Sequence, residues 1–315
     1  MKALIIGAAG FVGGHLMRCL REEWGWEIGA TKMARETITR DDVEIYDLDL
    51  ADQAAIAMVL GQARPDVIFH LAAQSSVALS WQQPELTVNV NVNGTLHLLD
   101  AVRALSWKPR ILLIGSGEEY GKIRPGDLPL AEDTPVRPGN LYAATKAAQN
   151  MIGSIYADAY QMELVMVRAF NHVGPGQNPM FVVSDFCKQV AEAEKGLREP
   201  VMRVGNLSSK RDFTDVRDVV RAYALLIQKG KAGETYNVGS GKALSIRDLL
   251  DQILSLSTAD IRVETDAAKF RPVDIPVIEA DTAKLRACTG WKPLIPLEQT
   301  LRETLDDWRD RLATL

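Results

Sequence analysis

The chain has 315 residues, of which 47% are hydrophobic and 24% charged, and this is the composition of an ordinary globular protein. The length exceeds the range in which a single core usually grows, so we expect one large domain and a smaller lobe. The net charge is −5 and there is no long run of Lys or Arg, which argues against a nucleic-acid partner. An anionic ligand would need a local basic pocket.

Cys19, Cys187 and Cys288 are far apart, and their spacing matches neither a zinc site nor a disulfide framework. We therefore expect no bound metal and a reducing compartment. The first apolar run, residues 1–7, is too short for a signal peptide, and no segment approaches the roughly 18 to 20 apolar residues of a membrane span. These features predict a soluble, cytoplasmic protein without a membrane partner.

Short apolar runs alternate with amphipathic segments through the first half of the chain. Helical periods, such as residues 15–23 and 96–105, separate these runs. Strands that alternate with helices predict an α/β fold, a doubly wound parallel sheet with helices on both faces. The expected strands are residues 2–6, 27–31, 43–46, 66–73, 110–115 and 164–169.

The alternation weakens after Asn171, where residues 174–179 are typical of a loop. Ser245 and Asp248 resemble a capping box that opens a helix ending near Leu256. We expect a cofactor-binding domain at 1–170, to which segments near 214–243 return, and a smaller C-terminal α/β substrate-binding lobe at 171–315. The other late elements expected are a helix at 183–195, strands at 201–204 and 236–238, and a closing helix at 297–312.

A glycine-rich turn directly follows the first expected strand and opens a helix. Gly7, Gly10 and Gly13 surround Phe11 and Val12 there, and such glycines let the backbone approach a pyrophosphate at a helix N-terminus. A glycine triplet alone is weak evidence and can be a tight turn without a ligand. Its position at the first strand–helix turn makes a dinucleotide site of the Rossmann type the better interpretation.

The end of the second strand normally carries an acid when the cofactor ribose is unphosphorylated. Residues 29–35 contain no acid here but contain two cations, Lys32 and Arg35. We therefore expect NADP(H) to be favoured, with NAD(H) possible. Either cation taken alone is as easily explained as a solvated loop charge.

Tyr142 and Lys146 are four residues apart and share a helix face. A neighbouring cation lowers the pKa of a phenol, so Tyr142 is expected to exchange a proton near neutral pH. Ser116 ends a buried strand, at the sheet edge where ligands bind, and Glu118 and Glu119 follow it. A Tyr-x-x-x-Lys pair is more often a surface pair, but this context favours an active site.

Together these residues resemble the extended short-chain dehydrogenase/reductases that act on nucleotide sugars, and the likeness covers nearly the whole chain. The resemblance implies that Ser116, Tyr142 and Lys146 form the catalytic group. It also adds cofactor contacts on the later strands and on the helix behind them. The full cofactor set it implies is Gly7, Gly10, Phe11, Val12, Gly13, Lys32, Asp49, Leu50, Leu71, Ala72, Ala73, Asn91, Tyr142 and Lys146.

The second half resembles the GDP-mannose branch of that family. The motifs are residues 170–172, 174–177, 205–207, 211–213, 271–274 and 290–293. By this resemblance Asn171 and Arg211 hold a diphosphate, Arg271 aids the phosphate, and Asp274 binds ribose hydroxyls. Gln74, Ser75 and Ser116 would also contact the substrate.

Two activities of this branch compete. The segment 116–121 and the loop 174–177 favour reduction of the C4 ketone of GDP-4-keto-6-deoxy-D-mannose to GDP-D-rhamnose. Glu118 falls on the position of the base in the GDP-mannose 4,6-dehydratases, so elimination stays open. A catalytically silent nucleotide sensor is disfavoured because Ser116, Tyr142 and Lys146 occur together.

The resemblance also implies a homodimer. It would pair the helix beginning near Pro84 and the helix that carries Tyr142, and bury Ala148, Met151 and Ile152 between the two chains.

Overall fold

A computed structural model describes residues 1–124, 126–269 and 275–313. Its main feature is a seven-stranded sheet in the order β10-β6-β5-β4-β1-β2-β3, in which all neighbours run parallel. The strands are β1 (Lys2–Ile6), β2 (Glu27–Lys32), β3 (Glu44–Asp47), β4 (Val67–His70), β5 (Arg110–Ser116), β6 (Leu164–Ala169) and β10 (Thr235–Val238).

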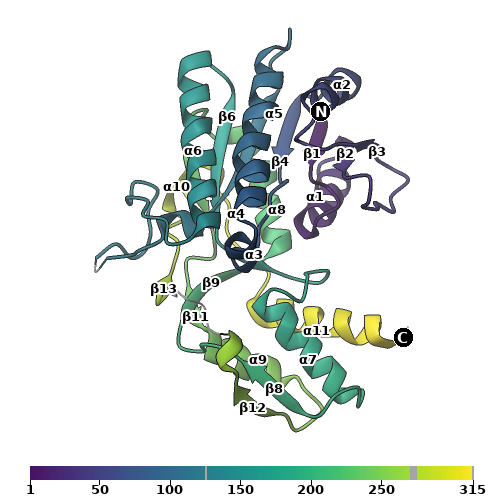
Figure 1. The fold of residues 1–315 in the computed structure, drawn as a ribbon, viewed down its shortest axis with the longest axis vertical. Helices are drawn as coiled ribbons and strands as arrows, with labels where there is room; N and C mark the ends of the chain where they lie inside the picture. Colours follow the sequence, from purple (N-terminus) through teal and green to yellow (C-terminus); the bar gives the residue numbers. More distant parts are fainter. Residues whose placement is uncertain (125, 270–274, 314–315) are drawn as a thin grey trace.

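Helices cover both faces of this sheet because its strands are apolar on both faces (Figure 1). Ala3 and Ile5 face a core shared with α1 and α8, whereas Leu4 and Ile6 face a core shared with α2, α5 and α6. The expected α/β Rossmann-type fold is therefore confirmed. The helices of this part are α1 (Phe11–Glu22), α2 (Gln53–Ala63), α3 (Val77–Gln82), α4 (Pro84–Val88), α5 (Gly94–Arg103), α6 (Leu141–Tyr160), α8 (Val216–Lys229) and α10 (Ala283–Thr289).

The chain leaves the sheet after β6 and later returns to it. Strand β7 (Asn171–Val173) and helix α7 (Val182–Glu194) lead into the lower part of Figure 1. Asp215 then caps α8 by accepting a hydrogen bond from the Arg217 N–H at 2.8 Å, and β10 pairs with β6 at the sheet edge. Segments distant in sequence therefore meet beside β6.

The remaining segments form a smaller layer below the sheet. Helices α7, α9 and α11 share a core with β8, and the side chain of Trp308 in α11 donates to Ser184 Oγ in α7 at 3.0 Å. Strand β9 pairs with β7, β11 and β13, and β8 pairs with β12. The elements are β8 (Val201–Val204), β9 (Lys210–Asp215), β11 (Ala243–Ser245), α9 (Ile246–Ser255), β12 (Arg262–Thr265), β13 (Val277–Ile278) and α11 (Leu297–Ala313).

Most expected elements are present with shifted ends. Helix α1 begins at Phe11 rather than at residue 15, because the glycine turn leads straight into it. Ser245 Oγ accepts from the Asp248 N–H at 2.9 Å, which is the first of the two bonds of the expected capping box. The expected strand at 66–73 ends at His70, because the backbone then turns into the cavity wall.

Three short helical turns complete the structure: a π-helical turn η1 (Asn89–Asn93) and 3₁₀ turns η2 (Gly117–Tyr120) and η3 (Ala267–Lys269). The π turn joins α4 to α5 and faces the loop after β4. Among the described residues, no helix combines the length and apolar character needed to span a membrane.

Candidate active site

A cavity of about 740 Å³ lies along the carboxyl edge of the main sheet. Its wall includes Ile6 at the end of β1, Leu71 just after β4, and Ser116 at the end of β5. The strand order reverses between β1 and β4, and open α/β sheets bind ligands at such a point.

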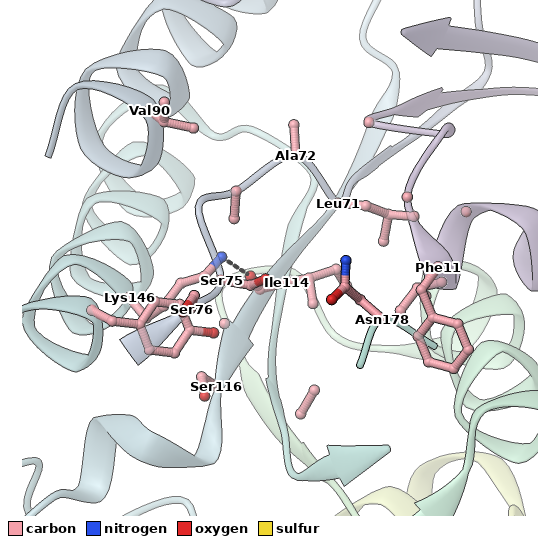
Figure 2. Close-up of a pocket in the computed structure, with 18 of the residues that line it drawn as sticks. Phe11, Leu71, Ala72, Ser75, Ser76, Val90, Ile114, Ser116, Lys146 and Asn178 are labelled. Carbon is pink, nitrogen blue, oxygen red and sulfur yellow. Dashed lines mark hydrogen bonds between the residues drawn. The ribbon is translucent and has the colours of Figure 1, made fainter. Parts of the chain in front are cut away.

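The cavity runs from the glycine turn to helix α6. Figure 2 shows Phe11 and Asn178 on one side and Lys146 and Ser116 on the other, with Ile114 between them. Segments from both halves of the chain therefore form one site, and the loop after β7 closes it opposite α6.

Gly7, Gly10 and Gly13 form a hollow in the cavity wall, which we call the glycine cradle. Side chains at Gly7 and Gly13 would collide with neighbouring backbone atoms. Gly7 has a φ of +84°, and a Cβ there would lie 2.7 Å from the backbone N of Ala72. A Cβ on Gly13 would overlap the Ala8 carbonyl oxygen. Gly10 caps α1 without a side chain, so the first N–H groups of the helix face the cavity and can bind a diphosphate. The residues present therefore fit a dinucleotide.

Thirteen of the fourteen expected cofactor residues line this cavity. They are Gly7, Gly10, Phe11, Val12, Gly13, Lys32, Asp49, Leu50, Leu71, Ala72, Ala73, Tyr142 and Lys146. The exception is Asn91, which is fully buried behind the wall. Its side chain accepts from the Gln74 N–H at 2.8 Å and donates to Thr145 Oγ1 at 2.9 Å, so it braces the loop after β4 against α6.

Acidic side chains outnumber cations at the β2 end of the cavity. Lys32 Nζ lies 2.5 Å from Asp47 Oδ1 at the end of β3. Glu36 also lines the cavity and accepts a hydrogen bond from the Met33 N–H at 2.9 Å. Arg35 is exposed and is not part of the lining. Of the two cations expected beside a 2′-phosphate, only Lys32 faces the cavity.

Ser116, Tyr142 and Lys146 meet at the other end of the cavity. Asn140 caps α6 by accepting from the Ala143 N–H at 2.8 Å, which fixes the first turn of α6 and with it Tyr142. Lys146 Nζ donates to the Ile114 carbonyl oxygen at 2.7 Å and to Gln149 Oε1 at 2.9 Å.

Burial dominates the ionisation of this group. Burial raises the pKa of the Tyr142 phenol, and hydrogen bonding to Ser116 opposes that rise. The expected lowering of the Tyr142 pKa by Lys146 is therefore absent here, because the ammonium points to the end of β5. Burial lowers the pKa of Lys146 itself to about 8, against the opposing effect of Glu119.

The two acids after Ser116 take different positions. Glu118 lines the cavity, and its Oε2 accepts from Asn140 Nδ2 at 3.3 Å. Glu119 is fully buried and accepts from the Ser116 N–H at 2.8 Å.

The expected substrate residues are only partly brought together. Ser75 and Asn171 line the cavity. Gln74 does not, because its side chain bonds to Ser76 and Thr87 and shapes the loop. Arg211 is buried outside the lining, and its guanidinium donates to the carbonyl oxygens of Lys210 and Ile275. Arg271 and Asp274 lie outside the described residues.

Sequence reasoning missed much of the lining. The loop after β7 supplies several residues, for which the Gly-Pro-Gly-Gln pattern was the available signal. Nothing in the sequence pointed to Tyr223, an interior residue of α8. The missed residues include Thr31, Met33, Glu36, Ser76, Val90, Phe170, His172, Gln177, Asn178, Met180, Phe181 and Tyr223. Nowhere in the described ranges do three or more His, Cys, Asp or Glu side chains form a group that could hold a metal ion.

A sequence model of the family described as GDP-mannose 4,6 dehydratase matches residues 4–304. The chain belongs to this family. GDP-6-deoxy-D-mannose reductase of Pseudomonas aeruginosa is 33% identical over 311 residues, which cover 99% of this chain and 98% of that protein. GDP-mannose 4,6-dehydratase of Yersinia enterocolitica is 28% identical over 347 residues, which cover 96% and 92%.

Solved structures show the same fold. RMD from Pseudomonas aeruginosa, complexed with NADPH, has a TM-score of 0.87 at 31% identity over 98% of this chain and 99% of that one. UDP-glucose 4-epimerase from Thermus thermophilus, in complex with NAD, has a TM-score of 0.88 at 30% identity over the same shares. The expected resemblance is confirmed, and this member of the GDP-mannose 4,6-dehydratase family is an enzyme of the extended short-chain dehydrogenase/reductase type.

Replacing Lys146 with methionine should change how stability depends on pH. Burial holds the pKa of Lys146 near 8 in the folded protein, against 10.5 for an unperturbed lysine. Burying the charge of Lys146 therefore destabilises the fold by roughly 3 kcal/mol below pH 8. This cost disappears as the pH rises from the folded pKa to the pKa of the unfolded lysine, because the folded protein then loses the charge first. The free energy of unfolding of the wild type minus that of Lys146→Met should increase over this interval, as measured by urea denaturation.

Lys108→Met, at an exposed position, controls for the general effect of removing a lysine. If the free energy of unfolding of the wild type minus that of Lys146→Met stays flat or falls across the same pH interval, the lowered pKa of Lys146 is contradicted.

Proposed function

We propose that the protein reduces the C4 ketone of GDP-4-keto-6-deoxy-D-mannose with NAD(P)H and forms GDP-D-rhamnose. The single observation that carries this proposal is the cavity that joins the glycine cradle to Ser116, Tyr142 and Lys146. The choice of reduction is supported by the reductase relative, which matches end to end at 33% identity, against 28% for the Yersinia dehydratase.

Each residue then has a defined task. A bound reduced nicotinamide would supply the hydride. Tyr142 donates a proton to the ketone oxygen, and the Ser116 hydroxyl donates a hydrogen bond to the same atom. The Lys146 ammonium, which here binds the end of β5, would bind the cofactor ribose and would then bring positive charge toward the phenol while its proton leaves. We infer that residues 1–170, together with the segments near 214–243 that return to them, bind the cofactor, and that the lobe formed by the rest of 171–315 binds the nucleotide sugar, with Ser75 and Asn171 in contact with it.

Dehydration of GDP-mannose is the second candidate, and the position of Glu118 favours it. The carboxylate of Glu118 lines the cavity beside Asn140, where a base can remove the C5 proton of a 4-keto sugar. Elimination across C5–C6 would then release water. This reaction regenerates its cofactor, whereas the reduction consumes one reduced cofactor per turnover.

The Glu118→Gln variant separates the two reactions because only elimination needs this base. We expect the wild type to leave GDP-mannose unchanged and to oxidise NADPH when GDP-4-keto-6-deoxy-D-mannose is supplied. Glu118→Gln should keep a substantial part of that reduction, followed by NADPH absorbance and by mass spectrometry of the sugar.

Tyr142→Phe is the control, and it should lose roughly 10²- to 10⁴-fold in turnover in either reaction while still binding the cofactor. Loss of water from GDP-mannose without net cofactor use, abolished in Glu118→Gln, would establish the dehydratase instead.

NADP(H) is the favoured cofactor, and NAD(H) is possible. The charge that supports this preference is Lys32, although a 2′-phosphate must compete with Asp47 for it. We expect NADPH to bind more tightly than NADH, and Lys32→Ala to weaken NADPH much more than NADH. Titration of the cofactor fluorescence measures both affinities.

Arg35→Ala is the matched control for Lys32→Ala, because Arg35 lies outside the cavity lining and should change neither affinity. Equal or tighter binding of NADH by the wild type would refute the preference.

We also propose a homodimer through α4 and α6. Met151 and Ile155 on α6 are 54% and 61% exposed, and Trp81 on α3 and Leu86 on α4, two helices that contact α6, are 52% and 42% exposed. The resemblance placed Ala148 and Ile152 at the same surface, and the alternative is that they face the core of their own chain. Both are partly exposed, and Ile152 also packs against the core of its own chain. A symmetric pair would remove these apolar side chains from water.

Light scattering at micromolar concentration should therefore give a dimer mass for the wild type and a monomer mass for the Met151→Glu/Ile155→Glu variant. A wild-type monomer would exclude this assembly.

A further inference from the structure

A buried carboxylate lies directly beneath Ser116. Glu119 is 0% exposed, and its two oxygens have different partners. Oε1 accepts from the Ser116 N–H at 2.8 Å, and Oε2 accepts from Arg168 Nε at 2.9 Å. This places one full negative charge behind the backbone of a proposed catalytic residue.

The surrounding structure is shaped to hold this carboxylate. A Cβ on Gly115 would overlap Glu119 Oε1, so only glycine fits at this strand position. Arg168 on β6 is fixed in turn, because its Nη1 donates to Tyr120 Oη at 3.0 Å and to the Glu132 carbonyl oxygen at 2.9 Å. The ion pair thus cannot shift without moving β5, β6 and η2.

Glu119 and Lys146 act on the same end of β5. The Lys146 ammonium binds the Ile114 carbonyl oxygen, and the Glu119 carboxylate binds the Ser116 N–H two residues later. Lys146 is 3% exposed, so water screens little of the attraction between them. Glu119 raises the pKa of Lys146 and so opposes the effect of burial.

Other ionisable groups face this cluster from each neighbouring element. His70 on β4 has its pKa lowered to about 3 by burial, so it is neutral beside Lys146. Glu118 and Glu119 on η2 both raise the pKa of the Tyr142 phenol, and Tyr142 raises the pKa of Tyr223 on α8. Within the described part of the chain, Glu119 is the one anion that raises the pKa of Lys146.

Burial raises the pKa of Glu119 to about 7, although Arg168, the Ser116 N–H and Lys146 all lower it. The hydrogen bonds favour the carboxylate form more strongly than this balance does. Both oxygens already accept hydrogen bonds, so a proton on either one would face a donor. A buried ion pair of this kind adds little net stability, because desolvation offsets the attraction. Stability therefore does not account for the Glu119–Arg168 pair, and its charge and geometry indicate another role.

We propose that Glu119, held by Arg168, is a positioning residue that fixes Ser116 and supplies the internal counter-charge that keeps Lys146 protonated. This proposal rests on the roles given above to Ser116 and Lys146. It does not depend on which sugar is reduced or dehydrated, because both reactions require a positive charge beside Tyr142.

The decisive measurement is the titration of Lys146 by NMR of protein labelled with ¹³C at the lysine Cε, with Lys146→Arg used to assign the resonance. Glu119→Gln keeps the size of the side chain and removes the charge. It should lower the Lys146 midpoint by about 1 to 3 pH units. An unchanged midpoint in Glu119→Gln would overturn the counter-charge role.

The Glu119→Gln/Arg168→Met double variant guards against simple misfolding, because removing both partners leaves neither charge unpaired. It should fold, as judged by thermal melting, and still titrate Lys146 below the wild-type midpoint. A double variant that folds and keeps the wild-type Lys146 midpoint would overturn the counter-charge role of the pair.

Turnover adds a second readout on whichever activity the wild type shows. The pH at which kcat declines on the basic side should fall in Glu119→Gln together with the Lys146 midpoint, and Glu119→Asp, which keeps the charge, should restore part of the shift. A kcat profile that does not move would overturn the proposal. If the wild type turns over neither sugar, the proposed function fails, while the NMR titration still decides the role of Glu119.

Discussion

The contact between Gly7 and Ala72 is the constraint on which the site depends. The two backbones approach so closely that a Cβ on Gly7 would lie 2.7 Å from the Ala72 nitrogen. This contact joins the loops after β1 and β4, where the strand order reverses. The helix after the turn then starts at the cavity with its N–H groups unpaired by side chains. A side chain at Gly7 would separate the two loops and fill the space meant for a diphosphate.

The reactive end of the cavity depends on burial rather than on a Tyr–Lys contact. Tyr142 and Lys146 share a face of α6, yet Lys146 binds the end of β5 in this structure. The Tyr142 phenol is therefore in a buried environment, which raises its pKa. Release of its proton requires a positive charge close to the phenol during the reaction. A bound cofactor ribose would offer the Lys146 ammonium another hydrogen-bond partner. This would change how close the positive charge lies to the Tyr142 phenol.

Hydrogen bonds tie the lobe below the sheet to the main sheet and its helices. Asp215 caps α8 and also accepts from Thr300 Oγ1 in α11 at 2.7 Å, so one carboxylate links the two parts. The loop after β7 is held between them, since His15 Nε2 lies 2.9 Å from the Pro175 carbonyl oxygen and the Gly176 N–H donates to Asp307. The cavity wall formed by that loop is thus set by both halves of the chain.

The sequence by itself determined the sheet strands, the glycine cradle and the group Ser116, Tyr142 and Lys146, because periodicity, glycine spacing and helical spacing are local properties. The resemblance to a known family supplied the other cofactor residues, and the structure shows that thirteen of the fourteen line one cavity. The tertiary structure alone decided that Gln74, Asn91 and Arg211 lie outside the lining, that Asp47 neutralises Lys32, and that Glu119 rather than Glu118 is buried behind Ser116. Such pairings join residues that are distant in the chain. Whether a side chain lines the cavity or lies behind its wall depends on tertiary packing, which a local sequence pattern does not contain.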